Sequence, residues 1–143
     1  MKKITLFSDG SALGNPGPGG YGVILRYNGK EKELSGSNSH TTNNRMELLG
    51  VIEGLRALKE PCEVDVVSDS SYVVKGINEW LHNWIKRDFK KVKNPDLWRE
   101  YMEVAKPHKI NAIWVRGHDG HTENERCDTL ARQEAQKAKD ALS

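Results

Sequence analysis

The pattern of apolar positions along the chain predicts alternating strands and helices. Short apolar runs predict strands through Ile4–Phe7 and over Tyr21–Tyr27, Glu31–Gly36, Cys62–Ser68 and Ile110–Val115. Apolar residues at helical spacing predict helices over Arg45–Lys59, Ser71–Lys75, Asn78–Arg87, Pro95–Ala105 and Thr122–Lys139. Suitable capping residues precede these helices, among them Thr42 or Asn43 before the first and Asn94 before the fourth.

The connections predict how the strands are arranged. Asn28-Gly29 indicates a tight hairpin between the second and third strands, because this pair suits the positive φ angles of a type I′ turn. The first three strands are expected to form an antiparallel meander, with the third at an edge. Helical crossovers favour a parallel arrangement of the first, fourth and fifth strands. The predicted fold class is α/β, with a five-stranded mixed sheet flanked by helices.

Two of the predicted core strands carry or end on a carboxylate. Asp9 follows the apolar part of the first strand, and Asp69 follows the end of the fourth. A buried charge is costly unless a counter-charge meets it. In open α/β sheets, ligands bind outside the carboxyl ends of strands where the connectivity changes direction. Both acids are expected at such a place.

Length and composition indicate one domain over residues 1–143. The chain has no apolar run near the roughly 20 residues of a membrane helix, and its start lacks the apolar region of a signal peptide. These features predict a cytoplasmic protein without membrane contact, and a monomer is the default expectation. Cys62 and Cys127 lack metal-site spacing and are expected in the core.

Positive charge is concentrated in one segment. The formal net charge is only +2, but between residues 86 and 93 one acid, Asp88, stands among five cations: Lys86, Arg87, Lys90, Lys91 and Lys93. A local basic patch can attract a polyanion even where the net charge is small. This segment is therefore a candidate nucleic-acid contact.

A glycine-rich loop provides a G-x-G-x-x-G match at Gly17, Gly19 and Gly22. A dinucleotide site requires this motif between a strand and a helix, whereas here the strand-like Tyr21–Tyr27 follows and Pro18 lies inside the motif. The Gly-Lys-Ser/Thr ending of a P-loop is also absent from the sequence. We expect no small-molecule cofactor at this loop.

Four acids stand out by position: Asp9, Glu47 on the first helix, Asp69, and Asp128 near the inward face of the last helix. Carboxylates brought together raise one another's pKa unless divalent cations hold them ionised. Ligation by carboxylates alone suits Mg²⁺ or Mn²⁺ rather than zinc, and two such ions about 4 Å apart support phosphoryl transfer. Alternatively, each acid is separately a cap, a solvated charge or an ion-pair partner. For Glu47 in the first helical turn, complementing the helix dipole is such an alternative.

A set of motifs favours the first interpretation. They are Asp9-Gly10-Ser11 with Gly14-Asn15-Pro16-Gly17, then Thr42–Leu48, Ser68-Asp69-Ser70, and Gly117-His118 with Asn124–Ala131. In this order, and across nearly the whole chain, they resemble type 1 ribonuclease H, most closely the stand-alone bacterial enzyme. The resemblance implies a ribonuclease H-like fold and hydrolysis of the RNA strand of RNA–DNA hybrids, leaving 5′-phosphate and 3′-hydroxyl ends.

The resemblance also implies catalytic roles. Asp9, Glu47, Asp69 and Asp128 match the family's metal-binding carboxylates, which are expected to hold two Mg²⁺ ions, with Mn²⁺ as a possible substitute. His118 matches the loop histidine that assists proton transfer or product release, a role that suits an imidazole titrating near neutral pH. The residues alone do not distinguish His118 from His121.

On the substrate side, Asn15, Asn43 and Asn44 match positions that contact the minor groove of the hybrid, and Thr42 matches a residue near a DNA-strand phosphate. Their alternative roles are turn formation for Asn15 and helix capping for Asn43 and Asn44. One asparagine can also do both, since it can form the turn or cap and contact the groove.

The segment from about residue 80 to residue 93 resembles the short basic protrusion that grips the DNA strand, and its expected contacts are Trp80, Lys86, Arg87, Lys90 and Lys91. We expect Trp80 to be partly exposed and Trp84 to pack. The protrusion is shorter than in the best-known bacterial enzyme, and Ile85 and Asp88 dilute its charge. Weaker binding through it is expected.

Three other functions fit parts of the pattern. A module that binds hybrids without cutting them is disfavoured because the carboxylate set is complete. A DNA nuclease or strand transferase of the wider superfamily would not need the asparagine-rich loops and the basic segment. A domain excised from a reverse transcriptase is opposed only weakly, by the lack of linker residues at either end.

Overall fold

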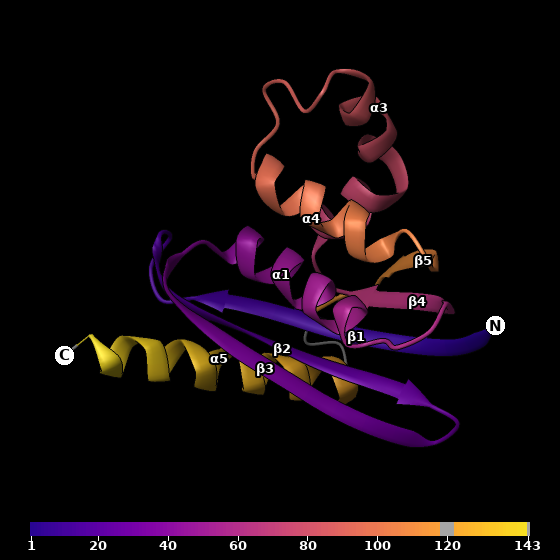
Figure 1. Cartoon of the computed structure of the whole chain (residues 1–143). Helices are drawn as coiled ribbons and strands as arrows, with labels where there is room; N and C mark the ends of the chain where they lie inside the picture. Colours follow the sequence, from indigo (N-terminus) through magenta and orange to yellow (C-terminus); the bar gives the residue numbers. More distant parts are fainter. Residues whose placement is uncertain (118–121, 143) are drawn as a thin grey trace.

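The computed structural model describes residues 1–117 and 122–142 (Figure 1). The strands are β1 (Lys2–Ala12), β2 (Gly17–Tyr27), β3 (Lys30–Thr41), β4 (Cys62–Ser68) and β5 (Lys109–Trp114). The helices are α1 (Asn43–Arg56), α2 (Ser71–Lys75), the π-helical turn η1 (Gly76–Trp80), α3 (Leu81–Lys86), α4 (Pro95–Ala105) and α5 (Thr122–Ala141).

The five strands form one mixed sheet in the order β3-β2-β1-β4-β5. Strand β2 pairs antiparallel with both β1 and β3, whereas β4 pairs parallel with both β1 and β5. Asn28 and Gly29 join β2 to β3 with φ angles of 55° and 78°, which suits the expected turn. The predicted fold class, the edge position of the third strand and the change of direction at β1 are all confirmed.

Helices cover both faces of this sheet. Helix α1 packs on β1 and β2, and α5 packs on β1, β2 and β3 from the opposite side (Figure 1). The larger apolar cluster includes Leu6 and Val66 of the sheet, Ile52 of α1 and Trp98 of α4. Cys127 of α5 packs with Phe7 and Ile24 in a second cluster. Both faces of β1 are therefore covered at its centre.

Cysteine chemistry is not a feature of this core. Cys62 and Cys127 are both free and buried, as the sequence predicts. Burial raises the pKa of the Cys127 thiol to about 12, so the thiol stays protonated at neutral pH.

No helix in the described ranges is long and apolar enough to cross a membrane.

Several predicted boundaries are wrong, most clearly those of the third strand and the first helix. Strand β3 runs to Thr41 instead of Gly36, because its polar second half continues to pair with β2 as far as Gly17. Helix α1 begins at Asn43 instead of Arg45 and ends at Arg56, three residues before the predicted end at Lys59. An exposed edge strand carries few apolar residues, so its length is poorly marked in the sequence.

The predicted start of the third helix, at Asn78, is also wrong. The chain is helical from Ser71 onward, with a π-helical turn over Gly76–Trp80 between α2 and α3. A side chain at Gly76 would overlap the ring of Trp98, so the glycine permits this turn to pack closely on α4. Asn94 precedes α4 in a left-handed conformation with φ of 57°, but its side chain does not cap the helix.

Candidate active site

Two parallel strands bring Asp9 and Asp69 to the same level of the sheet. The register of β1 and β4 pairs Phe7 with Val67, and each aspartate lies two residues beyond its member of that pair. β4 ends at Ser68, so Asp69 lies just past its carboxyl end. This is the place where the strand order changes direction, as the sequence predicts.

Glu47 reaches the same place from α1. The side chains of Asp9, Glu47 and Asp69 each offer an oxygen atom, and these atoms all lie within 4.8 Å of one another. Within the described ranges, this is the one group of acids, cysteines or histidines with such spacing. Three of the four predicted metal-binding carboxylates are therefore brought together.

The local sequence explains how Glu47 is positioned. Thr42 begins the helix as its N-cap, and its hydroxyl oxygen accepts a hydrogen bond of 3.2 Å from the backbone N–H of Arg45. Gly10 of β1 lies against the α1 backbone, where a side chain at position 10 would overlap the amide nitrogen of Glu47. Since the helix begins at Asn43, Glu47 lies beyond the first turn, so helix-dipole complementarity does not explain it.

The group has the electrostatics of closely spaced, buried acids, whose negative charges a bound cation would compensate. Asp9 is only 7% exposed, and burial, with smaller contributions from the charges of Asp69 and Asp128, raises its pKa to about 6. Burial and then the Asp9 charge raise the pKa of Glu47 well above its ordinary value. Two of these carboxylates ionise together only at considerable cost in the metal-free chain.

The hydrogen bonds leave one carboxylate oxygen unused. The Gly10 N–H donates to Oδ1 of Asp9 at 2.9 Å. Oε2 of Glu47 is buried and has no hydrogen-bond partner among the described residues. A buried acceptor without a donor is expensive, and a divalent cation ligated by oxygen atoms would satisfy it. The residues present fit Mg²⁺ or Mn²⁺.

Asp128 lies near this group but outside the set of closest oxygen atoms. Helix α5, which carries Asp128, packs on β1. The negative charge of Asp128 contributes to raising the pKa of Asp9. The Asp128 carboxylate forms an ion pair of 2.7 Å with Arg132, one turn further along the helix. Its predicted role as a metal ligand stays a prediction.

The predicted catalytic histidine, His118, lies outside the described residues, as does His121. The residue before them, Gly117, lies close to the site, because a Cβ atom there would be 2.8 Å from Oδ2 of Asp69. Trp114 was not singled out from the sequence, yet its indole N–H donates to the backbone carbonyl of Asp69 at 3.1 Å. Trp114 is 51% exposed.

The asparagines expected to contact the minor groove lie together at the start of α1. Oδ1 of Asn15 accepts from the backbone N–H of Asn43 at 3.2 Å, and Oδ1 of Asn43 accepts from the N–H of Ala12 at 2.7 Å. Asn15, Asn43 and Asn44 are all exposed. The alternative prediction that Asn43 or Asn44 caps the helix is wrong, because Thr42 is the N-cap and both asparagines lie within the helix.

The basic protrusion, residues 80–93, projects away from the sheet beyond α4 (Figure 1). Its predicted contacts Lys86, Arg87, Lys90 and Lys91 are all exposed, and Asp88 pairs with Arg99 at 3.3 Å. Trp80 is 37% exposed. Trp84 instead packs against Trp98, with ring centroids 5.2 Å apart. The expected difference between the two tryptophans is confirmed.

Arg45 connects the asparagine group to the base of the protrusion. Its guanidinium donates to both carboxylate oxygens of Asp96 at 3.0 and 2.8 Å and to Oδ1 of Asn94 at 3.2 Å. Asn94 in turn donates to the hydroxyl of Tyr72 at 3.1 Å. These hydrogen bonds of Arg45 thus hold the start of α1 to the start of α4, which directly follows the protrusion.

Comparisons with known proteins agree with this geometry. The family model for RNase H matches residues 1–136. A ribonuclease H of Sulfurovum sp. (strain NBC37-1) is 70% identical over 141 residues, covering 99% of this chain and 96% of the relative. The solved LC9-RNase H1, a type 1 RNase H with the type 2 active-site motif, superposes with a TM-score of 0.88 at 34% identity, covering 96% of this chain and 74% of that one. LC11-RNase H1, solved in complex with an RNA/DNA hybrid, superposes with a TM-score of 0.69 at 26% identity, covering 98% and 99%.

Proposed function

Because the chain belongs to the ribonuclease H family, we propose that it hydrolyses the RNA strand of RNA–DNA hybrids through a two-metal-ion site, leaving 5′-phosphate and 3′-hydroxyl ends. The observation that carries this proposal is the group formed by Asp9, Glu47 and Asp69, whose oxygen atoms lie within 4.8 Å of one another. No small-molecule cofactor is required. We expect the protein to act as a monomer in the cytoplasm.

The carboxylates supply the metal-binding part of this activity. Asp9, Glu47 and Asp69 would hold Mg²⁺, with Mn²⁺ as a substitute, and Asp128 would complete the set from α5. When bound, such ions activate a water molecule and stabilise the leaving oxygen in an in-line displacement. The buried carboxylates keep the ligand oxygens in place, and the raised pKa of Asp9 means that binding an ion releases protons near pH 6.

The exposed polar residues supply the substrate-binding part. A hybrid displays the 2′-hydroxyls of its RNA strand in a wide, shallow minor groove. The amides of Asn15, Asn43 and Asn44 lie at the surface near the carboxylates and can both donate and accept hydrogen bonds. The protrusion presents Lys86, Arg87, Lys90 and Lys91 to DNA-strand phosphates, and Thr42 lies beside the asparagines.

We expect His118 to assist proton transfer or product release. This proposal rests on the sequence motif and on the adjoining Gly117, which lies against Asp69. A neutral imidazole in such a loop can accept a proton, and its protonated form can donate one. Replacement of His118 by Ala should lower kcat without changing the affinity for the hybrid.

The experiment that tests the function is cleavage of a hybrid with separately labelled RNA and DNA strands in Mg²⁺, beside double-stranded RNA and DNA. Wild-type protein should cut only the RNA strand of the hybrid, and Asp9→Asn should bind the hybrid without cutting it. Binding without cutting by the wild type in both Mg²⁺ and Mn²⁺ would instead identify a binding module. Cutting of duplex DNA would identify a different nuclease of the superfamily.

A further inference from the structure

A cavity of about 380 Å³ lies between β5 and the helical segment that follows Asp69. Its lining residues are Ser71, Val74, Lys75, Glu79 and Trp114, and we call it the β5 pocket. The indole N–H of Trp114 donates to the backbone carbonyl of Asp69 at 3.1 Å, and Ser71 lies two residues after Asp69 in the chain. The pocket therefore adjoins the candidate active site.

The strand order places this pocket in line with the groups that are expected to bind substrate. The carboxyl ends of β1, β4 and β5 lie at one edge of the sheet, because these strands are parallel. Asn15 between β1 and β2, and Asn43 after β3, lie at the same edge, because β2 is antiparallel to both of its neighbours. Along this edge, a nucleic-acid strand that leaves the asparagines meets first Asp9, then Asp69 and then Trp114.

The pocket is also at a suitable distance for a neighbouring nucleotide. Adjacent strands of a sheet lie about 4.8 Å apart, so the backbone of β5 is roughly 10 Å from that of β1. A nucleotide bound at the carboxylates would therefore leave the β5 pocket free for one further along the same strand.

The pocket offers an aromatic surface and two opposite charges. Trp114 is 51% exposed, whereas Val74 is buried. Lys75 and Glu79 are both exposed, and neither has an ion-pair partner within residues 1–117 and 122–142. A π-helical turn over Gly76–Trp80 begins directly after Lys75 and contains Glu79, and such turns are frequent at functional sites. Both charges are available to a ligand.

We propose that the β5 pocket binds a ribonucleotide of the RNA strand beyond the scissile bond, on the side away from the asparagines, and that Glu79 recognises its 2′-hydroxyl. This proposal rests on the proposed function. The Lys75 ammonium would meet the phosphate, and the indole of Trp114 would pack against the ribose. The Glu79 carboxylate would accept a hydrogen bond from the 2′-hydroxyl, the group that distinguishes RNA from DNA.

The opposite charges of the pocket fit a ribonucleotide better than a deoxyribonucleotide. Lys75 attracts any phosphate, whereas a carboxylate repels phosphates and gains only where a donor such as a hydroxyl is present. A deoxyribonucleotide has no such donor, so it would leave the Glu79 carboxylate without a partner. The β5 pocket would therefore add to the selectivity for the RNA strand.

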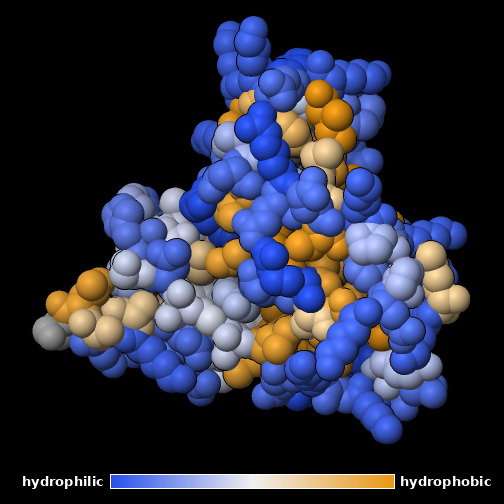
Figure 2. Space-filling view, in the orientation of Figure 1, coloured by the Kyte–Doolittle hydropathy of each residue, from blue (hydrophilic) through white to orange (hydrophobic). Residues whose placement is uncertain are grey.

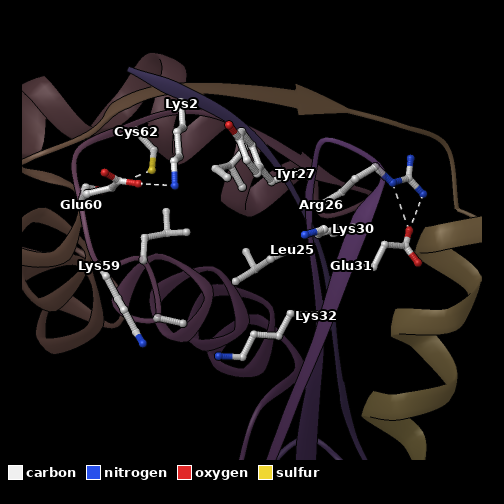
Figure 3. A pocket seen from close by; sticks show the side chains of 13 residues that line it. Lys2, Leu25, Arg26, Tyr27, Lys30, Glu31, Lys32, Lys59, Glu60 and Cys62 are labelled. Carbon is white, nitrogen blue, oxygen red and sulfur yellow. Dashed lines mark hydrogen bonds and ion pairs between the residues drawn. The ribbon is translucent and has the colours of Figure 1, made fainter.

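A lysine at the opposite end of the sheet provides a control for the loss of one positive charge. Figure 2 shows hydrophobic residues that reach the surface along α1 and the adjoining strands, between hydrophilic ones. Figure 3 shows a cavity at the start of β1, where Lys59 and Lys32 border Leu25. Because a strand rises about 3.3 Å per residue, Ile4 in that cavity is roughly 17 Å along β1 from Asp9. Lys59 is exposed there, remote from the carboxylates.

Mapping the cleavage of hybrids that carry one 2′-deoxy substitution in the RNA strand tests the proposal. In the wild type, the deoxyribose should lower cleavage about tenfold at the bond whose cutting places that sugar in the β5 pocket, as expected for loss of a hydrogen bond to a charged group. This bond lies at one fixed spacing from the deoxyribose. In Glu79→Ala the effect at this spacing should disappear, whereas effects at other spacings should persist.

The phosphate contact is tested by binding in the Asp9→Asn background, in which the hybrid stays intact. Lys75→Ala should weaken binding of the hybrid and reduce the slope of log Kd against log salt concentration by about 1. Lys59→Ala removes the same charge at the opposite end of the sheet and should change neither quantity. Thermal unfolding of each variant shows that it folds.

Two variants of Trp114 separate packing on the ribose from positioning of Asp69. Phenylalanine keeps an aromatic ring but lacks the N–H that reaches the Asp69 carbonyl, whereas alanine lacks both. If the ring packs on the ribose, Trp114→Phe should retain the affinity for the hybrid and Trp114→Ala should weaken it. Equal affinities of Trp114→Ala and the wild type would exclude the ring from substrate contact.

Several results would overturn the proposal. An unchanged pattern of 2′-deoxy effects in Glu79→Ala would show that this carboxylate does not contact a 2′-hydroxyl. Equal weakening of hybrid and duplex DNA binding by Lys75→Ala, with no effect of Glu79→Ala, would identify a general phosphate contact instead. Both results leave the nuclease activity intact. Failure of the wild type to cut an unsubstituted hybrid would instead overturn the proposed function, and this inference with it.

Discussion

Gly10 of β1 lies directly against the backbone of Glu47 in α1. A Cβ atom at position 10 would overlap both the amide nitrogen of Glu47 and the carbonyl carbon of Met46. The glycine therefore sets the distance between the strand that carries Asp9 and the helix that carries Glu47. Isolated glycines in strands often mark such close approaches of another backbone.

Gly10→Ala should consequently push α1 away from β1. We expect a loss of about 1–3 kcal/mol in the free energy of unfolding, because the overlap involves backbone atoms that cannot rotate away. Cleavage should fall about a hundredfold even where the protein is folded, since a displacement near 1 Å at a catalytic group has effects of that order. Urea unfolding and hybrid cleavage, measured on the same preparation, check both effects.

Gly50→Ala is the matched control for this prediction. Gly50 lies on α1, in the same contact between helix and sheet, but a Cβ atom there would be 3.4 Å from Tyr21 and 3.5 Å from Ser8, which are ordinary contacts. Alanine is favoured over glycine in a helix by about 1 kcal/mol, so this variant should be as stable as the wild type or more stable. Equal losses in the two variants would show that helix position is not controlled at Gly10.

The raised pKa values of the clustered carboxylates predict that the stability of the metal-free protein depends on pH. The pKa of Asp9 is raised to about 6 in the folded chain from 3.8, so the folded state binds protons more tightly than the unfolded state. This stabilisation is fully present below about pH 4 and is lost as the pH rises through 6. Glu47, whose pKa is also raised, acts in the same direction.

In EDTA, Asp9→Asn should therefore become more stable relative to the wild type as the pH rises from 4 to 8, by about 1–3 kcal/mol. Adding Mg²⁺ or Mn²⁺ at pH 8 should stabilise the wild type and leave the variant nearly unchanged. Thermal unfolding at several pH values, with and without metal, measures both effects. If the difference in stability between the two proteins stayed constant from pH 4 to pH 8, the pKa of Asp9 would not be raised in the metal-free protein.

The sequence predicts the sheet well because its signals are local. Asn28-Gly29 determines the hairpin, and the apolar run before Asp69 marks a buried strand that begins and ends where predicted, at Cys62 and Ser68. The crossover rule then arranges the parallel strands. Boundaries that depend on tertiary pairing, such as the end of β3 at Thr41, are not encoded in local periodicity.

Some residues of the candidate site could likewise be predicted from local sequence signals, and others could not. Asp9 and Asp69 are marked by acids at the ends of apolar strands, and Glu47 by its place in a motif. Trp114 is different, because its role comes from a hydrogen bond to the Asp69 carbonyl that no spacing in the sequence indicates. Gly10 could have been found as an isolated glycine after an acid in a predicted strand, although its partner on α1 could not.

The protrusion predicts a specific salt dependence of hybrid binding. Lys90 and Lys91 are exposed, and a phosphate contact made by either lysine releases counterions. Lys91→Ala should weaken binding to all hybrid sequences and reduce the slope of log Kd against log salt concentration by about 1. Cleavage at saturating substrate should be unchanged, since this lysine is remote from the carboxylates. Titrations at several salt concentrations measure the slope, and an unaltered slope would exclude Lys91 from phosphate contact.

Arg45 provides a final test, of how the protrusion is positioned relative to the groove. Its bonds to Asp96 and Asn94 hold the start of α4 beside the start of α1. The pair with Asp96 is solvent-accessible, so Arg45→Met should cost less than about 1 kcal/mol of stability. The Kd for the hybrid should nevertheless rise several-fold with kcat unchanged, because the two contact regions would no longer be held in register.

The other end of α1 offers the control for this variant. Arg56 also pairs with a residue of α4, Glu100, but at the end distant from the protrusion. Arg56→Met removes a comparable ion pair between the same two helices and should leave the Kd for the hybrid unchanged. If both variants raised the Kd equally, helix packing in general would be responsible. A larger effect of Arg45→Met, seen in Kd and not in kcat, would identify Arg45 as a residue that positions the protrusion for substrate.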